Sequence, residues 1–360
     1  MPRIISVGTA TPEFAVQQEE TMQLAKRLFS DSMKDIDRLL KVFKNGEIKK
    51  RHFVKPLEWY TEPHSFSEKN KVFIESAVGL CLTAIRNCFA LEKMKKEIAY
   101  DEIEAIFLIN TTGLSTPSLE ARIINQLPFS SHTKRIPIWG LGCGGGASGL
   151  SRAYEYCLAY PGAKVLVVGV ELCSLTFQLN DISKSNLIGT SLFSDGAAAV
   201  LVGGDDVPYD DLLDSPLPTI LSTQSTLMKH SLDVMGWQFE DDGFYVIFSK
   251  DIPTLVKNWL QPVMLQFLEQ NKLNESEIDH FIAHPGGKKV IMAYEEALHL
   301  PTNKTAQSLA ILKEYGNMSS VTVFFVLERF MNQPVSYGDY GMMASLGPGF
   351  SSELLLLRWE

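Results

Sequence analysis

The strongest constraint in this sequence is an order of strand, turn and helix signals that occurs twice along the chain. Residues 102–110 form an apolar strand pattern, and a turn rich in Gly, Thr, Ser and Pro separates it from a helix-period stretch over residues 119–127. Residues 277–284 repeat the strand pattern, followed by Pro-Gly-Gly and a helix-period stretch over residues 290–298. Strands and helices that alternate in this way indicate an α/β fold.

The spacing of two glycine steps supports a duplication of one α/β unit. A Gly-Cys step ends at Cys143, 40 residues after Ile103, and a Gly-Asn step ends at Asn317, 39 residues after Ile278. Each step opens a helix-period stretch. The sequence therefore predicts two duplicated halves whose helix N-termini, at Cys143 and Asn317, face a shared centre, although two unrelated α/β segments could also align this well.

A charged segment with several prolines divides the chain. Residues 205–218 contain five aspartates and three prolines, a composition that makes a poor core. We therefore expect a linker at residues 205–218 between an N-terminal half, residues 1–204, and a C-terminal half, residues 219–360.

A short segment near the end of the N-terminal half contains a turn signal. Residues 193–196, Phe-Ser-Asp-Gly, precede a small-residue strand pattern over residues 197–202. Asp195-Gly196 is a common turn dipeptide, so we expect a turn there. Phe193 could wall a pocket or pack in the core, and its place in the sequence does not choose between the two.

Charge and cysteine content limit the partners and the compartment. The chain has 33 basic and 42 acidic residues and a net charge of −9, which disfavours binding to nucleic-acid phosphates. No apolar run approaches about 18 residues, so no transmembrane segment is expected. The five cysteines are odd in number and show no CxxC spacing. They are typical of a reduced cytoplasmic protein and indicate neither a structural metal site nor a disulfide framework.

Cys143 is a candidate nucleophile because of the residues around it. It lies in Gly-Leu-Gly-Cys-Gly-Gly-Gly, between an apolar strand over residues 136–139 and a helix-period stretch. A thiol at a helix N-terminus lies near unpaired N–H groups and the positive end of the helix dipole. We therefore expect the pKa of Cys143 to fall below the free value of about 8.5. The alternative is a small buried cysteine in a glycine-rich turn.

The glycines that follow this cysteine need an explanation of their own. Gly144, Gly145, Gly146 and Gly149 are poor helix formers, and together they cost about 4 kcal/mol of intrinsic propensity relative to alanine. Close backbone packing of a buried helix would offset this cost and would leave room for a substrate near the first turn.

His284 and Asn317 are candidates to act with Cys143. His284 ends an apolar strand, where ligand crevices form in α/β sheets, and Gly286 and Gly287 allow a ligand to approach the backbone closely. The imidazole can bond a thiolate or a developing oxyanion, and the alternative is a solvated loop histidine. The amide of Asn317 can donate to a substrate oxygen at every pH, or it can serve as a helix N-cap.

A cysteine, a histidine and an asparagine together suit acyl transfer followed by decarboxylative condensation. Cys143 would take an acyl group from a thioester, and His284 and Asn317 would bind the thioester oxygen of a malonyl unit. Loss of CO2 generates the carbanion, so the reaction needs no carboxylate base.

Basic residues form small clusters in this acidic chain. Lys49, Lys50 and Arg51 are consecutive, and Lys288 follows the Gly-Gly turn. These side chains could meet the phosphates of coenzyme A, or they could be ordinary surface cations.

Six motifs, taken in order, resemble those of the type III polyketide synthases, the chalcone-synthase-like branch of the thiolase superfamily. They are GLGCGGGASGL around Cys143, LFSDGAAAVLVG from Leu192, SKDIP from Ser249, HPGG at His284, GNMSS at Gly316 and SLGPGFSSE from Ser345. The HPGG motif distinguishes this branch from the related ketoacyl synthases III, which also use Cys, His and Asn. The similarity spans nearly the whole chain.

The resemblance implies a thiolase-like, five-layered αβαβα fold in a homodimer. It implies a buried site that coenzyme A thioesters reach through a tunnel, with no cofactor, metal or carrier protein. In this reading Cys143 is the nucleophile, and His284 and Asn317 bind the thioester carbonyl. The implied substrate-contacting residues are Phe193 as a gatekeeper at the tunnel mouth, Thr111, Thr176, and Val246, which stands where plant enzymes have a second gatekeeper phenylalanine.

The chain is similar to the bacterial alkylpyrone synthases of the Bacillus type. That similarity implies fatty acyl-CoA and malonyl-CoA as partners, a long-chain starter, and release of alkylpyrones or alkylresorcinols. The small side chain of Val246 would leave space for an alkyl chain. Two alternatives stay open: a ketoacyl synthase III-like condensing enzyme that uses carrier-bound malonate, and a non-catalytic acyl-CoA-binding protein of the thiolase fold.

Overall fold

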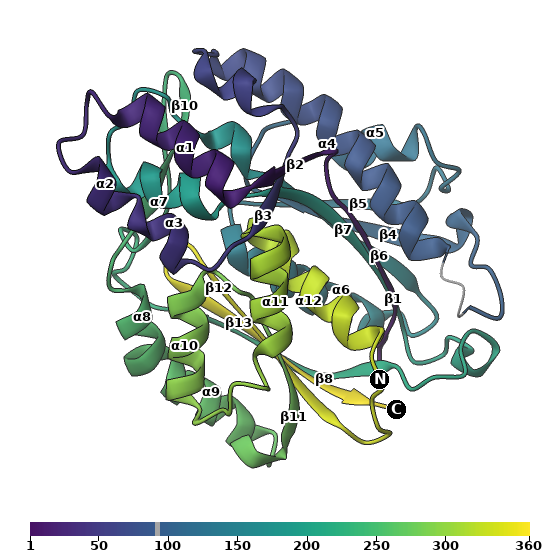
Figure 1. Ribbon diagram of the computed structural model, residues 1–360. Helices are drawn as coiled ribbons and strands as arrows, with labels where there is room; N and C mark the ends of the chain where they lie inside the picture. The colour runs from purple at the N-terminus through teal and green to yellow at the C-terminus, as the bar shows by residue number, and fades with distance from the viewer. Residues whose placement is uncertain (91–93) are drawn as a thin grey trace.

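A mixed sheet of nine strands forms the framework of the protein (Figure 1). The computed structural model describes residues 1–90 and 94–360. The strand order is β11-β12-β13-β8-β1-β7-β6-β4-β5. These strands are β1 (Arg3–Ala10), β4 (Ile103–Asn110), β5 (Lys134–Trp139), β6 (Lys164–Leu172), β7 (Asp195–Gly203), β8 (Pro218–Leu227), β11 (Ile278–Ala283), β12 (Tyr340–Gly347) and β13 (Ser351–Trp359). Two hairpin-like pairs lie outside the sheet: β2 (Phe14–Gln17) with β3 (Lys50–Phe53), and β9 (Met235–Glu240) with β10 (Gly243–Phe248).

The helices differ widely in length. In chain order they are α1 (Gln18–Phe29), α2 (Ile36–Leu39), α3 (Lys41–Asn45), α4 (Phe66–Phe89), α5 (Leu119–Ile124), α6 (Gly145–Ala159), α7 (Lys184–Leu192), α8 (Ile252–Leu255), α9 (Gln261–Gln270), α10 (Lys288–Ala297), α11 (Ala306–Tyr315) and α12 (Thr322–Met331). The predicted strands over residues 102–110 and 277–284 correspond to β4 and β11, and the helix-period stretches behind them overlap α5 and α10.

The large sheet consists of two parts that meet at one point. β1 pairs with β7 along its length but contacts β8 only at Arg3, opposite Thr219. On one side of this point lie β1, β7, β6, β4 and β5, and on the other side lie β8, β13, β12 and β11. Each part comes from one half of the chain, as the repeated pattern predicts.

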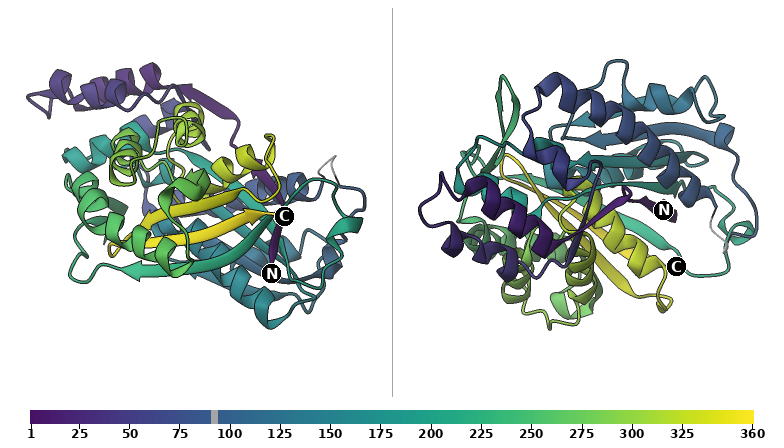
Figure 2. Two further views of the ribbon diagram at one scale, coloured as in Figure 1. Left: turned by 90° about the horizontal axis from the view of Figure 1, so that it is seen from below. Right: turned by 45° about the horizontal axis from the view of Figure 1, so that its top comes forward.

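Helices cover both faces of each part and produce five layers (Figure 2). α4 and α5 pack on the outer face of the N-terminal strands, and α9 and α10 pack on the outer face of the C-terminal strands. α6 and α12 lie between the two parts and contact strands of both. The predicted αβαβα fold is confirmed.

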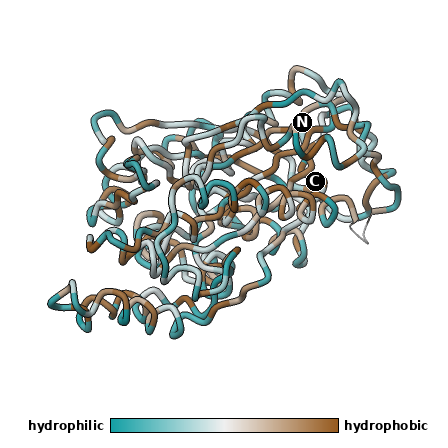
Figure 3. Tube along the Cα trace, turned by 90° about the horizontal axis from the view of Figure 1, so that it is seen from above, coloured by the Kyte–Doolittle hydropathy of each residue, from teal (hydrophilic) through white to brown (hydrophobic). Residues whose placement is uncertain are grey.

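The central strands β6 and β7 are largely apolar, and both of their faces are buried. In β7, Ala197 and Leu201 pack toward the outer helices, whereas Ala198 and Val200 pack toward α6 and α12. Apolar segments accordingly lie mainly inside the layers, and many loops at the periphery are hydrophilic (Figure 3). The alternation places small side chains beside the central helices and lets those helices approach the sheet closely.

Helices α1 to α3 extend away from the layers (Figure 2). They form a small core of their own, in which Met22, Ala25 and Phe29 of α1 pack with Phe43 and with Leu187 of α7. α1 is therefore held against α7 and not against the large sheet.

The expected turn at Asp195-Gly196 is wrong. β7 begins at Asp195, and Gly196 is its second residue. The Asp195 carboxylate is buried and accepts hydrogen bonds from the backbone N–H groups of Ser174 (2.7 Å) and Val54 (2.9 Å). These long-range bonds satisfy the aspartate inside the sheet, so its local turn preference does not decide the conformation.

The segment at residues 205–218 connects β7 to β8. Contrary to its composition, it contributes to the core. Its buried apolar residues, which join the outer core beside α4, are Val207, Tyr209, Leu212, Leu213 and Leu217. The segment is thus anchored to the N-terminal layers, and the division of the chain at residues 204 and 219 stays a prediction.

Among the described helices, α4 alone is long and apolar enough to cross a membrane by length and composition. One face of α4, including Phe73, Ala77, Cys81 and Ile85, is buried against the sheet. A core helix that packs in this way passes the same test of length and composition.

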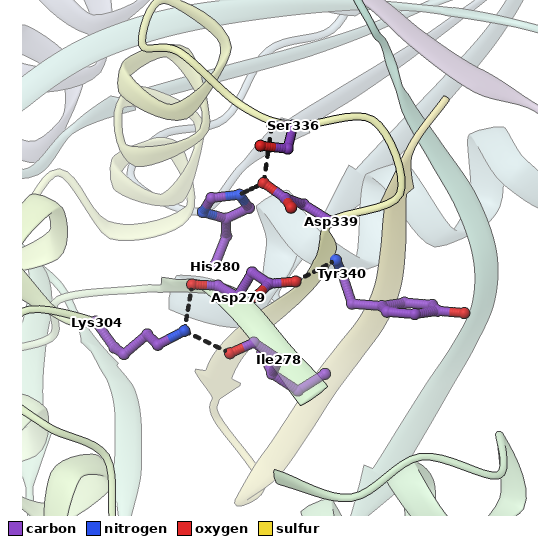
Figure 4. A network of polar contacts seen from close by, with 7 residues as sticks. All are labelled: Ile278, Asp279, His280, Lys304, Ser336, Asp339 and Tyr340. Atoms are coloured by element: carbon purple, nitrogen blue, oxygen red, sulfur yellow. Dashed lines mark hydrogen bonds and ion pairs between the residues drawn. The ribbon is translucent and has the colours of Figure 1, made fainter. Parts of the chain in front are cut away.

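A polar network fixes the edge strand β11 at the end remote from His284 (Figure 4). His280 Nε2 lies 2.9 Å from Asp339 Oδ2, and the N–H of Tyr340 donates to Asp279 Oδ2 at 3.0 Å. Lys304 Nζ donates to the carbonyl oxygen of Asp279 at 2.8 Å. These contacts bind β11 to the start of β12 and give His280 a structural role.

The glycines at the start of α6 are explained by close packing. A Cβ on Gly146 would lie 2.2 Å from the carbonyl oxygen of Ser320, and a Cβ on Gly145 would lie 2.6 Å from Ile109 Cγ2. Gly149 would meet the side chain of Ile109 at 2.6 Å. The prediction of close backbone packing is confirmed, and this packing brings the first turns of the two central helical segments together.

We expect Gly146→Ala to lower the free energy of unfolding by about 3 kcal/mol or more, because the backbone of Ser320 would have to move. Gly79→Ala is the matched control, since Gly79 is exposed in the middle of α4 and a Cβ there meets nothing within 4 Å. That variant should gain about 1 kcal/mol from helix propensity. Urea unfolding of both variants measures the difference, and equal stabilities would contradict the packing argument.

Candidate active site

Cys143 lies where β5 turns into α6. The chain reverses there through Gly140 and Gly142, whose φ angles are +89° and +47°, and enters a short 3-10 turn that continues into the helix. The thiol is buried, and its Sγ lies 3.6 Å from Ser319 Oγ. The sulfur from the N-terminal half therefore faces the segment that carries Asn317 in the C-terminal half.

The backbone of Asn317 is tied to the end of α7. Its N–H donates to the carbonyl oxygen of Leu192 at 2.8 Å, and its carbonyl oxygen accepts from the N–H of Ser194 at 2.9 Å. These two bonds form a parallel bridge between Phe193 and Asn317. The predicted gatekeeper and the predicted amide donor thus belong to one bonded unit, although they come from different halves of the chain.

The side chain of Asn317 has a fixed orientation. Its Oδ1 accepts a hydrogen bond from the N–H of Ser319 at 2.8 Å, and its Nδ2 donates to the carbonyl oxygen of Gly286 at 3.1 Å. The amide oxygen therefore holds the local turn at residues 317–319, but the N-cap of the short 3-10 turn is Met318 and that of α12 is Val321, so the N-cap alternative is wrong. Because its oxygen is occupied, its NH2 group is the end that faces the loop after His284.

His284 lies directly after β11 and is buried. Its backbone N–H donates to Ala344 at 2.8 Å, and the backbone of Gly286 folds back over the ring, so that a Cβ on Gly286 would lie 3.6 Å from His284 Nε2. Within the described residues, neither ring nitrogen has a hydrogen-bond partner. Burial lowers the pKa of His284 to about 3, so the imidazole is neutral at physiological pH and both nitrogens are available to a substrate.

The expected fall in the pKa of Cys143 is wrong. Burial raises the pKa of the thiol to about 11; hydrogen bonds with Ser319 and Asn317 lower it, while the nearby Glu171 raises it further. Desolvation thus outweighs the position at a helix N-terminus. Cys143 is therefore a neutral thiol, and the imidazole of His284 is neutral as well.

Glu171, a residue that no sequence motif indicated, is completely buried near enough to Cys143 to raise the pKa of its thiol. Its carboxyl group accepts hydrogen bonds from Thr111 Oγ1 (2.7 Å), Thr112 Oγ1 (2.8 Å) and Ser320 Oγ (2.6 Å), and burial raises its pKa. A signal was present, because a single acidic residue interrupts the apolar strand over residues 164–172. Since the hydroxyl group of Thr111 is engaged here, its role in substrate binding stays a prediction.

Three of the predicted substrate residues line one apolar pocket beside the site. Phe193, Thr176 and Val246 belong to it, and the ring of Phe193 contacts those of Trp237 (5.8 Å between centroids) and Phe248 (5.6 Å). The remaining lining residues come from α1, β3, residues 57–60, residues 173–177 and α7, and are Thr21, Leu24, Ala25, Leu28, Arg51, Phe53, Leu57, Tyr60, Cys173, Ser174, Phe177, Asn186, Gly189 and Thr190. α1 therefore provides an aliphatic wall that the sequence pattern did not indicate.

The four residues predicted to bind phosphate lie in different environments. Arg51 is 1% exposed and donates to backbone carbonyl oxygens, so its predicted contact with a coenzyme A phosphate is wrong. Lys288 is ion-paired with Glu47. Lys49 is exposed and Lys50 is half-buried. For Lys49, Lys50 and Lys288 the phosphate contact stays a prediction.

Residues 1–90 and 94–360 contain no group of three or more His, Cys, Asp or Glu side chains that could hold a metal ion.

Known proteins resemble this chain along its whole length. Residues 2–206 match the N-terminal domain of the chalcone and stilbene synthases, and residues 219–359 match their C-terminal domain. A putative chalcone synthase of Bacillus subtilis (strain 168) is 53% identical to this chain. The alignment covers 100% of this chain and 99% of that relative. A 1,3,6,8-tetrahydroxynaphthalene synthase of Streptomyces peucetius subsp. caesius is 33% identical, over 99% of this chain and 93% of the relative.

A solved structure agrees with this match. The 1,3,6,8-tetrahydroxynaphthalene synthase of Streptomyces coelicolor A3(2), described as a bacterial type III polyketide synthase, superposes with a TM-score of 0.91 at 29% identity and covers 99% of both chains. Both family domains are present, in the order N-terminal then C-terminal, and the two folds agree over the whole chain. The protein therefore belongs to the chalcone and stilbene synthase family and is a type III polyketide synthase.

Proposed function

We propose that this type III polyketide synthase loads a long-chain fatty acyl group from acyl-CoA onto Cys143, extends it with malonyl-CoA and releases alkylpyrones or alkylresorcinols. The observation that carries this proposal is the apolar pocket beside the site, whose wall includes the aliphatic residues Leu24, Ala25 and Leu28 of α1. Each methylene of an acyl chain buried there contributes about 0.8 kcal/mol. An aromatic starter would not use a wall of this kind as fully.

Loading uses Cys143 and His284. The sulfur attacks the carbonyl carbon of fatty acyl-CoA, so that a new C–S bond forms and the bond to the coenzyme A sulfur breaks. The thiol proton passes to the neutral imidazole of His284 and from there to the leaving coenzyme A thiolate. The two ring nitrogens of His284, which have no hydrogen-bond partner among the described residues, support this role.

Extension uses His284 and Asn317 as donors. In malonyl-CoA the bond to the carboxylate carbon breaks, CO2 leaves, and the electron pair moves onto the thioester, whose oxygen becomes an enolate. A ring N–H of His284 and the Nδ2 of Asn317 stabilise this oxygen. The enolate carbon then attacks the acyl carbon on Cys143, the C–S bond breaks, and the released thiolate takes up a proton from water.

The family match favours this reaction over the two alternatives from the sequence. A ketoacyl synthase III-like enzyme would take malonate from a carrier protein, whereas both domains of this chain match the chalcone and stilbene synthases. A non-catalytic acyl-CoA-binding protein would have no need for a thiol, an imidazole and an amide on three different segments.

We also propose that coenzyme A thioesters suffice without a further cofactor. From the five free cysteines we propose that the enzyme is cytoplasmic.

We further propose a homodimer formed through the edge strand β5. This strand has one neighbour, β4, and most of its side chains are exposed or half-buried. Around its end lie the exposed apolar residues Leu114, Trp139, Leu141 and Phe239, and the rings of Trp139 and Phe239 are 5.9 Å apart. A second copy of the chain that covers this edge would bury these side chains and pair the free strand.

Substitution of the catalytic residues should separate the two half-reactions. We expect Cys143→Ala to abolish the acyl adduct and all product. Asn317→Ala should slow malonyl-CoA decarboxylation by about 100-fold and loading much less, because one oxyanion donor is lost. Intact-protein mass spectrometry measures loading, and acetyl-CoA formation measures decarboxylation.

Cys157→Ala provides the control, since this buried thiol lies near the C-terminal end of α6, the helix that follows Cys143, and its loss should leave the adduct intact. Equal losses of both half-reactions in Asn317→Ala would indicate that the side chain acts only by holding the local turn. Product formation by Cys143→Ala would refute the nucleophile assignment.

The size of residue 246 should set the starter length. Val246 lines the pocket, so we expect Val246→Phe to lower kcat/KM for long acyl-CoA starters by at least about tenfold relative to short ones. Ile247→Phe also introduces a phenylalanine, at the next position of β10, which lies outside the pocket lining. It should leave the preference for starter length unchanged. A Val246→Phe enzyme with the wild-type preference would contradict the proposed pocket.

The oligomeric state tests the proposed edge contact. Sedimentation velocity should show a dimer for the wild type and a monomer for Trp139→Asp, because a charge would be buried in the interface. Tyr337→Asp, at an aromatic residue that is 75% exposed on another surface, is the control and should stay dimeric. A wild-type monomer at micromolar concentration would exclude this interface.

A further inference from the structure

Arg51 is a buried cation for which the proposed reaction provides no task. It is 1% exposed, and its Nη1 donates to two backbone carbonyl oxygens, those of Thr190 (2.6 Å) and Phe193 (2.8 Å). Its guanidinium carbon lies 5.1 Å from the centre of the Phe53 ring. Among the described residues no carboxylate lies within ion-pair distance of it, so its charge is balanced mainly by carbonyl dipoles and an aromatic face.

Burial of such a group is costly. Burial lowers the pKa of Arg51 to about 9, although the negative charge of Asp195 raises it. Replacement of buried charged groups by apolar ones of similar volume is often neutral or stabilising in proteins. The presence of an arginine at this position therefore calls for a role in addition to the filling of space.

The two carbonyl groups that Arg51 binds lie at the C-terminal end of α7, where carbonyl oxygens lack partners within the helix. The carbonyl of Leu192, between them in the sequence, accepts the N–H of Asn317. Arg51 thus fixes the direction of the carbonyl groups on both sides of the one that holds Asn317.

The stem of Arg51 contacts the other side of the same bridge. Gly316 has a φ of +74°, and a Cβ there would lie 2.8 Å from Arg51 Cγ and 3.0 Å from the carbonyl oxygen of Leu192. The arginine therefore touches the chain on both sides of the Phe193–Asn317 bridge: its guanidinium at residues 190–193 and its methylenes at Gly316. A single side chain from β3 spans the junction between the two halves.

We infer that Arg51 is a positioning residue that sets Asn317 and Phe193 in register for the decarboxylation of malonyl-CoA. This inference rests on the proposed function of Asn317 as a donor to the thioester oxygen. Cys143 and Ser319 lie outside the hydrogen-bond contacts of Arg51, and Arg51 is only one of many residues that line the acyl pocket, so loading depends on it less than decarboxylation does. Removal of the guanidinium leaves the carbonyls of Thr190 and Phe193 unpaired, and the bridge shifts. A displacement of about 1 Å at a donor is enough to lower a rate by about 100-fold.

The test compares two half-reactions in Arg51→Met and Arg51→Lys. Methionine keeps much of the volume without the donors, and lysine keeps the charge on a shorter side chain that lacks the planar guanidinium whose Nη1 bonds both carbonyls. For each variant, intact-protein mass spectrometry follows acylation of Cys143 by palmitoyl-CoA, and acetyl-CoA formation from malonyl-CoA alone follows decarboxylation. Thermal unfolding reports stability separately, and Arg358→Met, at an arginine on β13, controls for the loss of an arginine elsewhere.

For Arg51→Met we expect the rate of decarboxylation to fall at least about tenfold more than the rate of acylation, with a smaller difference between the two steps in Arg51→Lys. Arg358→Met should keep the wild-type ratio of the two rates. Equal losses in both steps, or a loss in neither, would overturn the inference, as would failure of both Arg51 variants to fold, since the residue would then be purely structural. A wild-type enzyme that neither acylates Cys143 nor decarboxylates malonyl-CoA would refute the proposed function instead.

Discussion

The contact between the first turn of α6 and the backbone before α12 determines the geometry of the site. Gly146 lies against the carbonyl group of Ser320 at a distance that no residue with a Cβ would tolerate. This approach brings the turn that carries Cys143 to the turn that carries Asn317. Neither half of the chain holds all the functional groups by itself, so the chemistry depends on how closely the two halves pack.

The sequence predicted the elements whose signals are local. The apolar strands, the glycine steps at Cys143 and Asn317, and the close packing of α6 all follow from patterns within a few residues. The turn at Asp195 and the phosphate contact of Arg51 were wrong because both side chains are buried by partners more than 100 residues away or by backbone of other elements. Burial of this kind is a property of the tertiary structure, and no local pattern reports it.

Burial also reverses the expected electrostatics of the site. A helix N-terminus favours a thiolate, but the dry interior and the neighbouring Glu171 favour the thiol, and the same interior keeps His284 neutral. The thiol, the imidazole and the amide are therefore all uncharged before the reaction. Such a site suits thioesters, which are neutral at the reacting carbonyl, and it limits side reactions of the sulfur with oxidants or small electrophiles. Charge forms only during the reaction, where the amide and the imidazole can stabilise it.

The wall that α1 contributes to the apolar pocket has a consequence for the evolution of this protein. The reacting groups lie at the centre of the layers, whereas α1 belongs to an arm that extends away from them and has a small core of its own. Substitutions in this arm can reshape the pocket without disturbing the junction of the two halves. Substrate range and catalytic power can therefore diverge under separate selection, since one depends on a peripheral appendage and the other on the centre of the architecture.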